Sequence, residues 1–208
     1  MVWRHFGMPR TVPRFRRRPA GAGSCCGGCN RHKLRQRRCA TGAGSIGSRA
    51  RGLDISLVQG DMADLSVFDD GQFDLVFNPV SNVFAERLAP VWQECARVLG
   101  PGGRLLTGFM NPCYYLFDHD AIERGEQPEA RFRLPYRDTD FLQTDSVKQR
   151  LERGDSLEFG HSLDDQIGGE LAAGLNVAGF YEDYWSDEAT PLNRYMPTSM
   201  ATLALKAS

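Results

Sequence analysis

Phe73-Asp-Leu-Val-Phe-Asn78 and Arg104-Leu-Leu-Thr-Gly-Phe109 are two short runs of branched and aromatic residues that flank a segment with a helical pattern. The apolar residues of that segment recur every three or four positions between Phe84 and Leu99. A strand, a helix and a second strand in this order predict two parallel strands joined by a right-handed crossover. We therefore expect an open α/β sheet.

The ends of the crossover helix are also marked in the sequence. Ser81 or Asn82 can cap its first turn, and Gly100-Pro-Gly-Gly103 can stop it before the next strand. These signals predict a helix over residues 81–99.

A further strand is predicted upstream, at Ile55–Gln59, and it runs into a loop that contains Asp61. The three predicted strands then end at Asp61, Asn78 and Asn111. In open α/β sheets, ligands bind beyond the carboxyl ends of the strands. We therefore expect the functional site near these three side chains.

Charge divides the chain into two parts. Residues 1–51 contain 13 of the 25 lysine and arginine residues and none of the 26 aspartate and glutamate residues. Residues 52–208 therefore carry 12 basic and 26 acidic side chains, a balance of −14. The first part is rich in Gly, Arg and Cys and poor in aliphatic residues, so it cannot bury enough apolar surface to offset the entropy of ordering. We expect residues 1–50 to be disordered and residues 51–208 to form one α/β domain.

Three functions can be considered for the basic segment. Cys26, Cys29, His32 and Cys39 offer thiolate and imidazole groups, but their spacing lacks the regular pairs of zinc sites, so no metal site is predicted. A basic tract without acids suits nucleic-acid phosphates, although few aromatic residues are present for stacking on bases. An organellar transit peptide would contain more serine. Nucleic-acid binding therefore stays an alternative that the sequence does not favour.

The bulk features are those of a cytoplasmic protein. No run approaches the roughly 18 apolar residues of a membrane span, and the arginine-rich N-terminus has no apolar signal core. The six cysteines do not have the dispersed spacing of a secreted disulfide scaffold. We expect a cytoplasmic protein without a membrane partner.

The region after the second core strand contains an insertion. Residues 111–153 are polar and show little long-range periodicity, which predicts a segment over the carboxyl edge of the sheet, where substrate recognition commonly occurs.

The C-terminal part predicts a helix followed by a hairpin. Ser162-x-x-Asp165 resembles a capping box, and Val177–Trp185 and Ser199–Lys206 suit two strands of an antiparallel sheet edge. The apolar face of the helix is expected to consist of Ile167, Leu171, Ala172 and Leu175.

With these residues identified, residues 53–206 resemble the later part of a class I S-adenosylmethionine-dependent methyltransferase. The most specific piece is Arg97-Val-Leu-Gly-Pro-Gly-Gly103 before an apolar strand. The similar pieces, in the expected order, are Val58–Leu65 (third-strand acidic motif), Phe73–Asn78 (fourth strand), Trp92–Leu106 (helix, turn and fifth strand), and Val177–Trp185 with Met200–Lys206 (terminal hairpin). The resemblance implies a Rossmann-like α/β sheet, incomplete here because its first two strands are not recognisable. It also implies S-adenosyl-L-methionine as cofactor and methyl transfer to an acceptor that the sequence does not name. The acidic balance of residues 52–208 favours a small molecule over a nucleic acid as that acceptor.

The resemblance implies four cofactor-binding residues. The carboxylate of Asp61 would accept the amino hydrogens of adenine, and the thioether of Met62 would pack on the ring. Asn78 and Pro79 would border the methionine end of the cofactor. The alternatives without a role in cofactor binding are a solvent-exposed acid in a turn for Asp61 and a residue that starts a turn for Asn78.

Methyl transfer from a sulfonium depends mainly on alignment and a dry site, so the sequence defines no required catalytic residue. A base helps when the acceptor carries a proton. His161, Tyr114, Tyr115 and Asp165 are the candidates, although a histidine beside a helix cap also suits a structural role.

Two elements of the family have no counterpart upstream: a first strand with a glycine-rich loop, and a second strand ending in an acid that holds the ribose. No Asp or Glu precedes Asp54. We hypothesise that residues up to about Ser48 are translated out of frame, and that the native frame resumes near Arg51. The abrupt change in composition motivates this, since misread GC-rich codons give an Arg/Gly/Cys/Pro/Ala bias. Such a chain would lack half of the cofactor pocket and be inactive.

Two other classes of function are compatible with these residues. One is a non-catalytic methyltransferase-like module whose basic arm binds nucleic acid. The other is an α/β nicotinamide dehydrogenase, whose own glycine-rich phosphate loop is equally absent.

Overall fold

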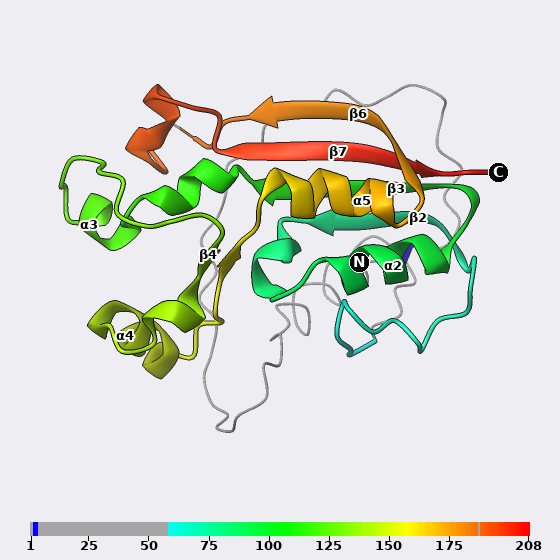
Figure 1. The fold of residues 1–208 in the computed structure, drawn as a ribbon, viewed down its shortest axis with the longest axis horizontal. Helices are drawn as coiled ribbons and strands as arrows, with labels where there is room; N and C mark the ends of the chain where they lie inside the picture. Colours follow the sequence, from blue (N-terminus) through cyan, green and yellow to red (C-terminus); the bar gives the residue numbers. More distant parts are fainter. Residues whose placement is uncertain (1, 4–57, 187) are drawn as a thin grey trace, which may run out of the picture.

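A computed structural model describes residues 2–3, 58–186 and 188–208 of the chain (Figure 1). Its strands are β1 (Val2–Trp3), β2 (Phe73–Pro79), β3 (Leu99–Met110), β4 (Tyr136–Arg137), β5 (Phe159–Gly160), β6 (Leu175–Asp183) and β7 (Ser199–Lys206). Its α-helices are α2 (Ala89–Val98), α3 (His119–Glu123), α4 (Asp145–Arg153) and α5 (Gly169–Ala172). Shorter helical turns are η1 (Ser81–Phe84), η2 (Pro112–Leu116), η3 (Asp138–Phe141), η4 (Asp164–Gly168) and η5 (Pro191–Arg194).

Among the described residues, the main sheet has five strands in the order β1-β2-β3-β7-β6. β2 and β3 are parallel, with Val76 opposite Leu105, while β7 pairs antiparallel with both β3 and β6. The predicted α/β class, the parallel crossover and the antiparallel edge hairpin are confirmed. β1 pairs antiparallel with β2 through Val2 and Trp3, a pairing that no sequence pattern predicted.

Several expectations fall on residues outside this description. Residues 4–57 contain most of the predicted strand at Ile55–Gln59, the cysteine and histidine group of the basic segment, and the proposed change of frame. Of that strand, only residues 58–59 are described, and they form no strand.

Neither a membrane span nor a metal site is present among the described residues. No helix there is long and apolar enough to cross a membrane. No group of His, Cys, Asp and Glu side chains in these ranges could hold a metal ion.

The crossover helix begins later than the sequence signals indicate. Residues 81–84 form the 3₁₀ helix η1, and α2 starts only at Ala89, so neither Ser81 nor Asn82 caps α2. Pro90 explains the start, because proline lacks the N–H that a helix interior needs and is tolerated in the first turn. The next strand also begins earlier than predicted, at Leu99, which is opposite Phe73 of β2.

The core lies between the sheet and the layer formed by α2 and α5, which lie over the same face in Figure 1. Trp92, Val98 and Leu99 are completely buried in it, with Leu105 of β3. α2 therefore supplies the apolar stripe that its sequence periodicity predicted.

The helix that follows the capping box departs from prediction. The capping box itself forms, since Ser162 N and Oγ both donate to Asp165 Oδ2 and Asp165 N donates to Ser162 Oγ. However, Leu171 is 54% exposed, whereas Gln166 and Glu170 are buried. The expected apolar face was therefore wrong for Leu171 and Ala172, which are exposed, whereas Ile167 is half-buried and Leu175 lies in the core as the first residue of β6. Buried polar groups with hydrogen-bond partners decide which side of this helix faces the sheet.

Candidate functional site

The insertion lies beyond the carboxyl ends of β2 and β3, on the left of Figure 1. It runs from η2 to β5 and contains α3 and α4. β4 and β5 form a separate two-stranded ribbon within it, with Tyr136 opposite Gly160. The site predicted at this edge therefore has the sheet on one side and the insertion on the other.

A chain of buried amide side chains starts at the end of β2. Asn78 Nδ2 donates to Asn82 Oδ1 at 2.7 Å, and Asn82 Nδ2 donates to Gln166 Oε1 at 2.7 Å. Gln166 belongs to η4, a π-helical turn, and such turns are often found at functional sites. The chain fixes the amide orientation of Asn78 and leaves its Oδ1 without a hydrogen bond to any described residue.

His161 supports η1, the helical turn that contains Asn82. Its Nε2 lies 2.8 Å from Ala85 O and 3.2 Å from Asn82 O, so the ring donates this N–H to the main chain. Burial lowers the pKa of His161, which keeps the imidazole neutral at physiological pH. In this arrangement Nε2 holds η1 in place and is not available as a base.

The backbone after β2 is bent sharply. Val80 has φ 55° and ψ 18°, a left-handed conformation that is unfavourable for a β-branched residue. Its N–H donates to Gly108 O of β3 at 2.7 Å, which holds the bend. Pro79, just before it, is exposed at the edge. Strained backbone of this kind is concentrated at functional sites.

Asp61 and Met62 lie on the loop before β2. Asp61 is exposed, and its Oδ1 accepts a hydrogen bond from Ala63 N at 2.9 Å, which closes an Asx turn. Met62 is half-buried and packs against the main core. Asp61 therefore has the turn geometry that was the alternative to cofactor binding. Its contact with adenine stays a prediction.

The two candidate tyrosines of η2 belong to aromatic clusters. Tyr114 stacks on His119 with ring centroids 3.7 Å apart, and burial raises the pKa of Tyr114 to about 12. Tyr115 stacks on Tyr136 at 5.5 Å, and burial raises the pKa of its hydroxyl strongly. Both phenols stay protonated at neutral pH. Asp165, the fourth candidate, is occupied by the capping box.

No sequence pattern indicated the polar group formed in the insertion by Asp138, Arg150 and Glu158. Asp138 is completely buried and accepts hydrogen bonds from Tyr136 Oη at 2.7 Å, from Glu158 N at 2.7 Å and from Arg150. Burial raises the pKa of Glu158. Asn82 and Gln166 were likewise missed as partners, because their spacing of 84 residues leaves no local pattern.

The described residues at this edge offer one wall for a cofactor. Asn78 Oδ1 accepts no hydrogen bond from any described residue, and the bend at Val80 beside it is held by Gly108 O. The sequence contains no acid before Asp54 that could hold the ribose.

Three comparisons relate this chain to known proteins. Residues 30–107 match the family described as methyltransferase domain. The uncharacterized methyltransferase YbaJ of Bacillus subtilis strain 168 is 44% identical over 155 residues, which is 74% of this chain and 59% of that protein. The chain thus spans less than two thirds of the length of this relative.

A solved structure shows the same fold. The S-adenosylmethionine-dependent methyltransferase of Mesorhizobium loti superposes with a TM-score of 0.55 at 13% sequence identity, covering 80% of this chain and 77% of that one. Together with the parallel β2–β3 pair and the antiparallel hairpin, these matches support a class I S-adenosylmethionine-dependent methyltransferase family, whose cofactor is S-adenosyl-L-methionine.

Proposed function

We propose that the domain serves methyl transfer from S-adenosylmethionine to a small-molecule acceptor, and that the chain in its present form lacks part of the cofactor pocket. The observation that carries this proposal is Asn78 at the carboxyl end of β2. Its amide nitrogen is fixed by Asn82, and its Oδ1 accepts no hydrogen bond from any described residue at the edge where ligands of open α/β sheets bind.

The cofactor would supply an activated methyl group on a sulfonium. The residues of this chain would bind and orient it: Asn78 and Pro79 at its methionine end, and Asp61 with Met62 on the adenine side. Asp61 Oδ1 accepts the hydrogen bond from Ala63 N, and the second oxygen of this exposed carboxylate would accept one from the adenine amino group.

The candidate bases have other roles in this structure. Nε2 of His161 is bound to main-chain carbonyls, Tyr114 and Tyr115 keep their protons at neutral pH, and Asp165 belongs to the capping box. The site would therefore act through alignment and exclusion of water, which can supply much of the barrier reduction for methyl transfer.

The acceptor is proposed to be a small molecule. The domain over residues 52–208 carries a balance of −14, which opposes binding of a polyanion. The insertion over the carboxyl edge would contain the residues that recognise the acceptor.

Calorimetry with S-adenosylhomocysteine tests the proposal on two proteins. The first is the present chain, and the second is the chain expressed from DNA in which the frame upstream of Arg51 is restored. We expect no measurable binding to the first, because its sequence shows no strand followed by a glycine-rich loop and no acid before Asp54 that could hold the ribose. Binding to the second is expected, and replacing Asn78 with Ala should weaken it about tenfold, as loss of one hydrogen bond to a charged group would.

Two results would contradict parts of this proposal. Tight binding of S-adenosylhomocysteine to the present chain would show that its pocket is complete. Absence of a strand and a glycine-rich loop in the other forward frames of the encoding DNA would refute the change of frame.

A further inference from the structure

Arg97 starts the motif Arg97-Val-Leu-Gly-Pro-Gly-Gly103, but the candidate site makes no use of its side chain. It lies in the last turn of α2, beside the loop of residues 61–71 that contains Asp61 and Met62. All five N–H groups of its guanidinium donate hydrogen bonds, three to this loop and two to Glu94. An arginine with every donor in use is a candidate for a positioning role.

The 61–71 loop has little regular structure of its own. The structure describes no strand or helix within it. Two short turns are closed by Asp64 N, which donates to Asp61 O at 3.1 Å, and by Phe68 N, which donates to Leu65 O at 2.8 Å. The rest of its main chain therefore needs partners from outside the loop.

Arg97 supplies these partners from α2. Its Nη2–H donates to Leu65 O at 2.9 Å, and its Nη1–H donates to Phe68 O at 3.0 Å. Leu65 and Phe68 are the two ends of the second turn. One planar guanidinium thus fixes both ends of that turn at once.

Glu94, three residues earlier on α2, binds the same place. Its Oε2 accepts a hydrogen bond from Leu65 N at 2.6 Å, and its two oxygens accept from Nε and Nη2 of Arg97, both at 2.8 Å. The hydrogen bond from Arg97 lowers the pKa of Glu94, so the carboxylate stays charged at physiological pH. The pair therefore satisfies both the N–H and the C=O of Leu65.

Apolar contacts hold the same loop against the core. Met62, Leu65 and Phe68 are half-buried there, and the ring of Phe68 meets that of Phe73 edge-on at 5.1 Å. Such packing is not directional, so it keeps the loop near the core without fixing which way its main chain faces. The hydrogen bonds from α2 supply that direction.

Consecutive turns join Asp61 to this anchored part of the loop. Ala63 N donates to Asp61 Oδ1 at 2.9 Å, Asp64 N donates to Asp61 O, and Ser66 N donates to Asp64 Oδ1 at 3.1 Å. The main chain from Asp61 to Leu65 thus forms one unit, whose position is set by the two side chains of α2.

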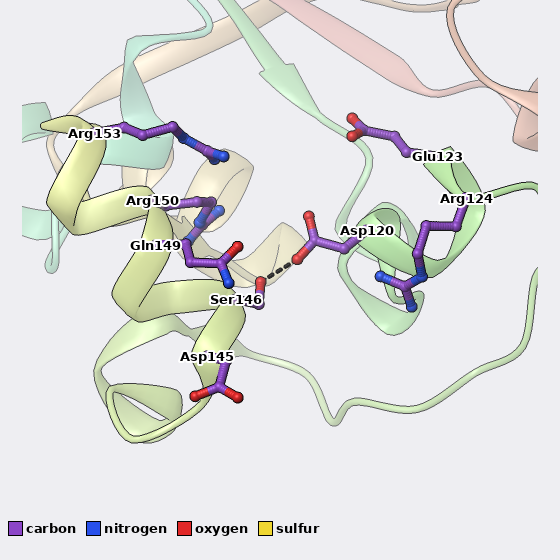
Figure 2. Close-up of a pocket in the computed structure, with 8 residues that line it drawn as sticks. All are labelled: Asp120, Glu123, Arg124, Asp145, Ser146, Gln149, Arg150 and Arg153. Atoms are coloured by element: carbon purple, nitrogen blue, oxygen red, sulfur yellow. Dashed lines mark hydrogen bonds between the residues drawn. The ribbon is translucent and has the colours of Figure 1, made fainter.

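The arginines around the cavity between α3 and α4 do not bind main chain in this way. Figure 2 shows Arg124 and Arg153 there. Arg124 pairs with Glu126 at 2.9 Å and Arg153 with Asp155 at 3.3 Å, and all four side chains are exposed. Neither guanidinium donates to a main-chain oxygen of any described residue. Such surface pairs contribute little to stability, so the main-chain bonds distinguish Arg97.

We propose that Arg97, together with Glu94, is a positioning residue that fixes the 61–71 loop and, through it, the place of Asp61 and Met62. Both residues act through the loop and not by contact with a ligand. The loop-fixing role depends only on contacts within this chain, whereas its effect on the adenine side of the site rests on the proposed function.

Hydrogen exchange followed by mass spectrometry, on the full chain without cofactor, tests the loop-fixing role. Arg97→Lys keeps the charge but places three donors on one nitrogen, which cannot reach both carbonyls and both carboxylate oxygens. We expect R97K to raise the exchange rate of residues 61–71 about tenfold, with the rates in β3 and β7 unchanged. An unchanged rate in the loop, or an equal rise in all three segments, would overturn the proposal.

Asp70→Asn is the matched control. Asp70 Oδ1 accepts a hydrogen bond from the same guanidinium at 2.7 Å, but its side chain is 83% exposed, so this ion pair contributes little. We expect D70N to exchange like the unmodified chain. A rise in D70N equal to that in R97K would show that the surface ion pair holds the loop, which would contradict the proposal.

Glu94→Gln is a second variant for the case in which R97K does not fold. It keeps the shape of the side chain but exchanges one acceptor oxygen for an amide, which cannot accept from both Leu65 N and Arg97. The 61–71 loop should again exchange faster than β3 and β7. The same exchange rates in E94Q and the unmodified chain would overturn the proposal.

The effect on the adenine side is measured in the chain whose frame upstream of Arg51 is restored. S-adenosylhomocysteine is compared there with S-inosylhomocysteine, which has an oxygen in place of the adenine amino group. R97K should lower the preference for the adenine compound several-fold, because Asp61 is no longer held in place. An unchanged preference would overturn this effect. Absence of any binding to the unmodified restored chain would refute the proposed function, and hydrogen exchange would still decide the loop-fixing role.

Discussion

Glu170 places a carboxyl group between α5 and the sheet, where its side chain is completely buried. Its Oε1 accepts a hydrogen bond from Thr202 Oγ1 at 2.7 Å. Its Oε2 and the hydroxyl of Thr107, which is opposite Thr202 in the sheet, are buried without a hydrogen bond in good geometry. Burial raises the pKa of Glu170 above its ordinary value, because the charged form loses its hydration.

This pKa predicts a dependence of stability on pH. Below the ordinary pKa of a glutamate, Glu170 is protonated in both the folded and the unfolded chain. As the pH rises through the raised pKa, the folded state must accept a buried charge, so this contribution to stability is lost. Glu170→Gln has no proton to lose. We expect it to match the unmodified chain near about pH 5 and to exceed it by about 1 kcal/mol at about pH 8, by urea unfolding.

Glu152→Gln serves as the control for Glu170→Gln, because Glu152 is exposed on α4. Its unfolding free energy should follow that of the unmodified chain at both pH values. A loss of stability in E170Q at the higher pH would show that the buried charge is favourable, which is the opposite of the expected sign.

Among the elements, the packing of α5 on α2 depends on a close approach at Gly169. A Cβ at this position would meet the indole of Trp92, with Nε1 at 2.6 Å and Cδ1 closer still. The same indole Nε1–H donates to Asp165 O at 2.8 Å, so the contact also fixes the preceding turn, η4. Only glycine lets the helix come this near to the ring.

Gly169→Ala should therefore destabilise the domain by about 1–3 kcal/mol, although alanine favours helices. Urea unfolding followed by tryptophan fluorescence measures this. Gly60→Ala is the control, since a Cβ there meets no atom closer than 3.8 Å and the change should be close to neutral. A gain in stability for G169A would mean that helix propensity outweighs the contact with Trp92.

The whole molecule combines an acidic domain with a basic N-terminal segment, and this asymmetry decides whether it binds nucleic acid. Residues 1–51 contain thirteen basic residues, and residues 52–208 carry a net charge of −14. We expect the full chain not to bind an oligouridylate of about 20 nucleotides at physiological salt, because the acidic domain repels the phosphates.

Fluorescence anisotropy across a salt series checks this expectation. Tight binding whose logarithm falls with a slope of about −4 against log salt would indicate about six phosphate contacts. That outcome would favour the non-catalytic module with a nucleic-acid-binding arm over a small-molecule methyltransferase.

The sequence by itself determined the order β2, α2, β3 and the final hairpin, because strand and helix periodicities are local. Gly100-Pro-Gly-Gly103 cannot continue the helix and lies in the first part of β3. It also determined the capping box at Ser162 and Asp165, whose partners are three residues apart.

Only the tertiary structure decided which side of α5 faces the sheet and which residues meet at the edge. Gln166 and Glu170 are buried because Asn82 and Thr202 satisfy them across 84 and 32 residues. Such pairings have no period along the chain, since hydrogen bonds and charges act between neighbours in space.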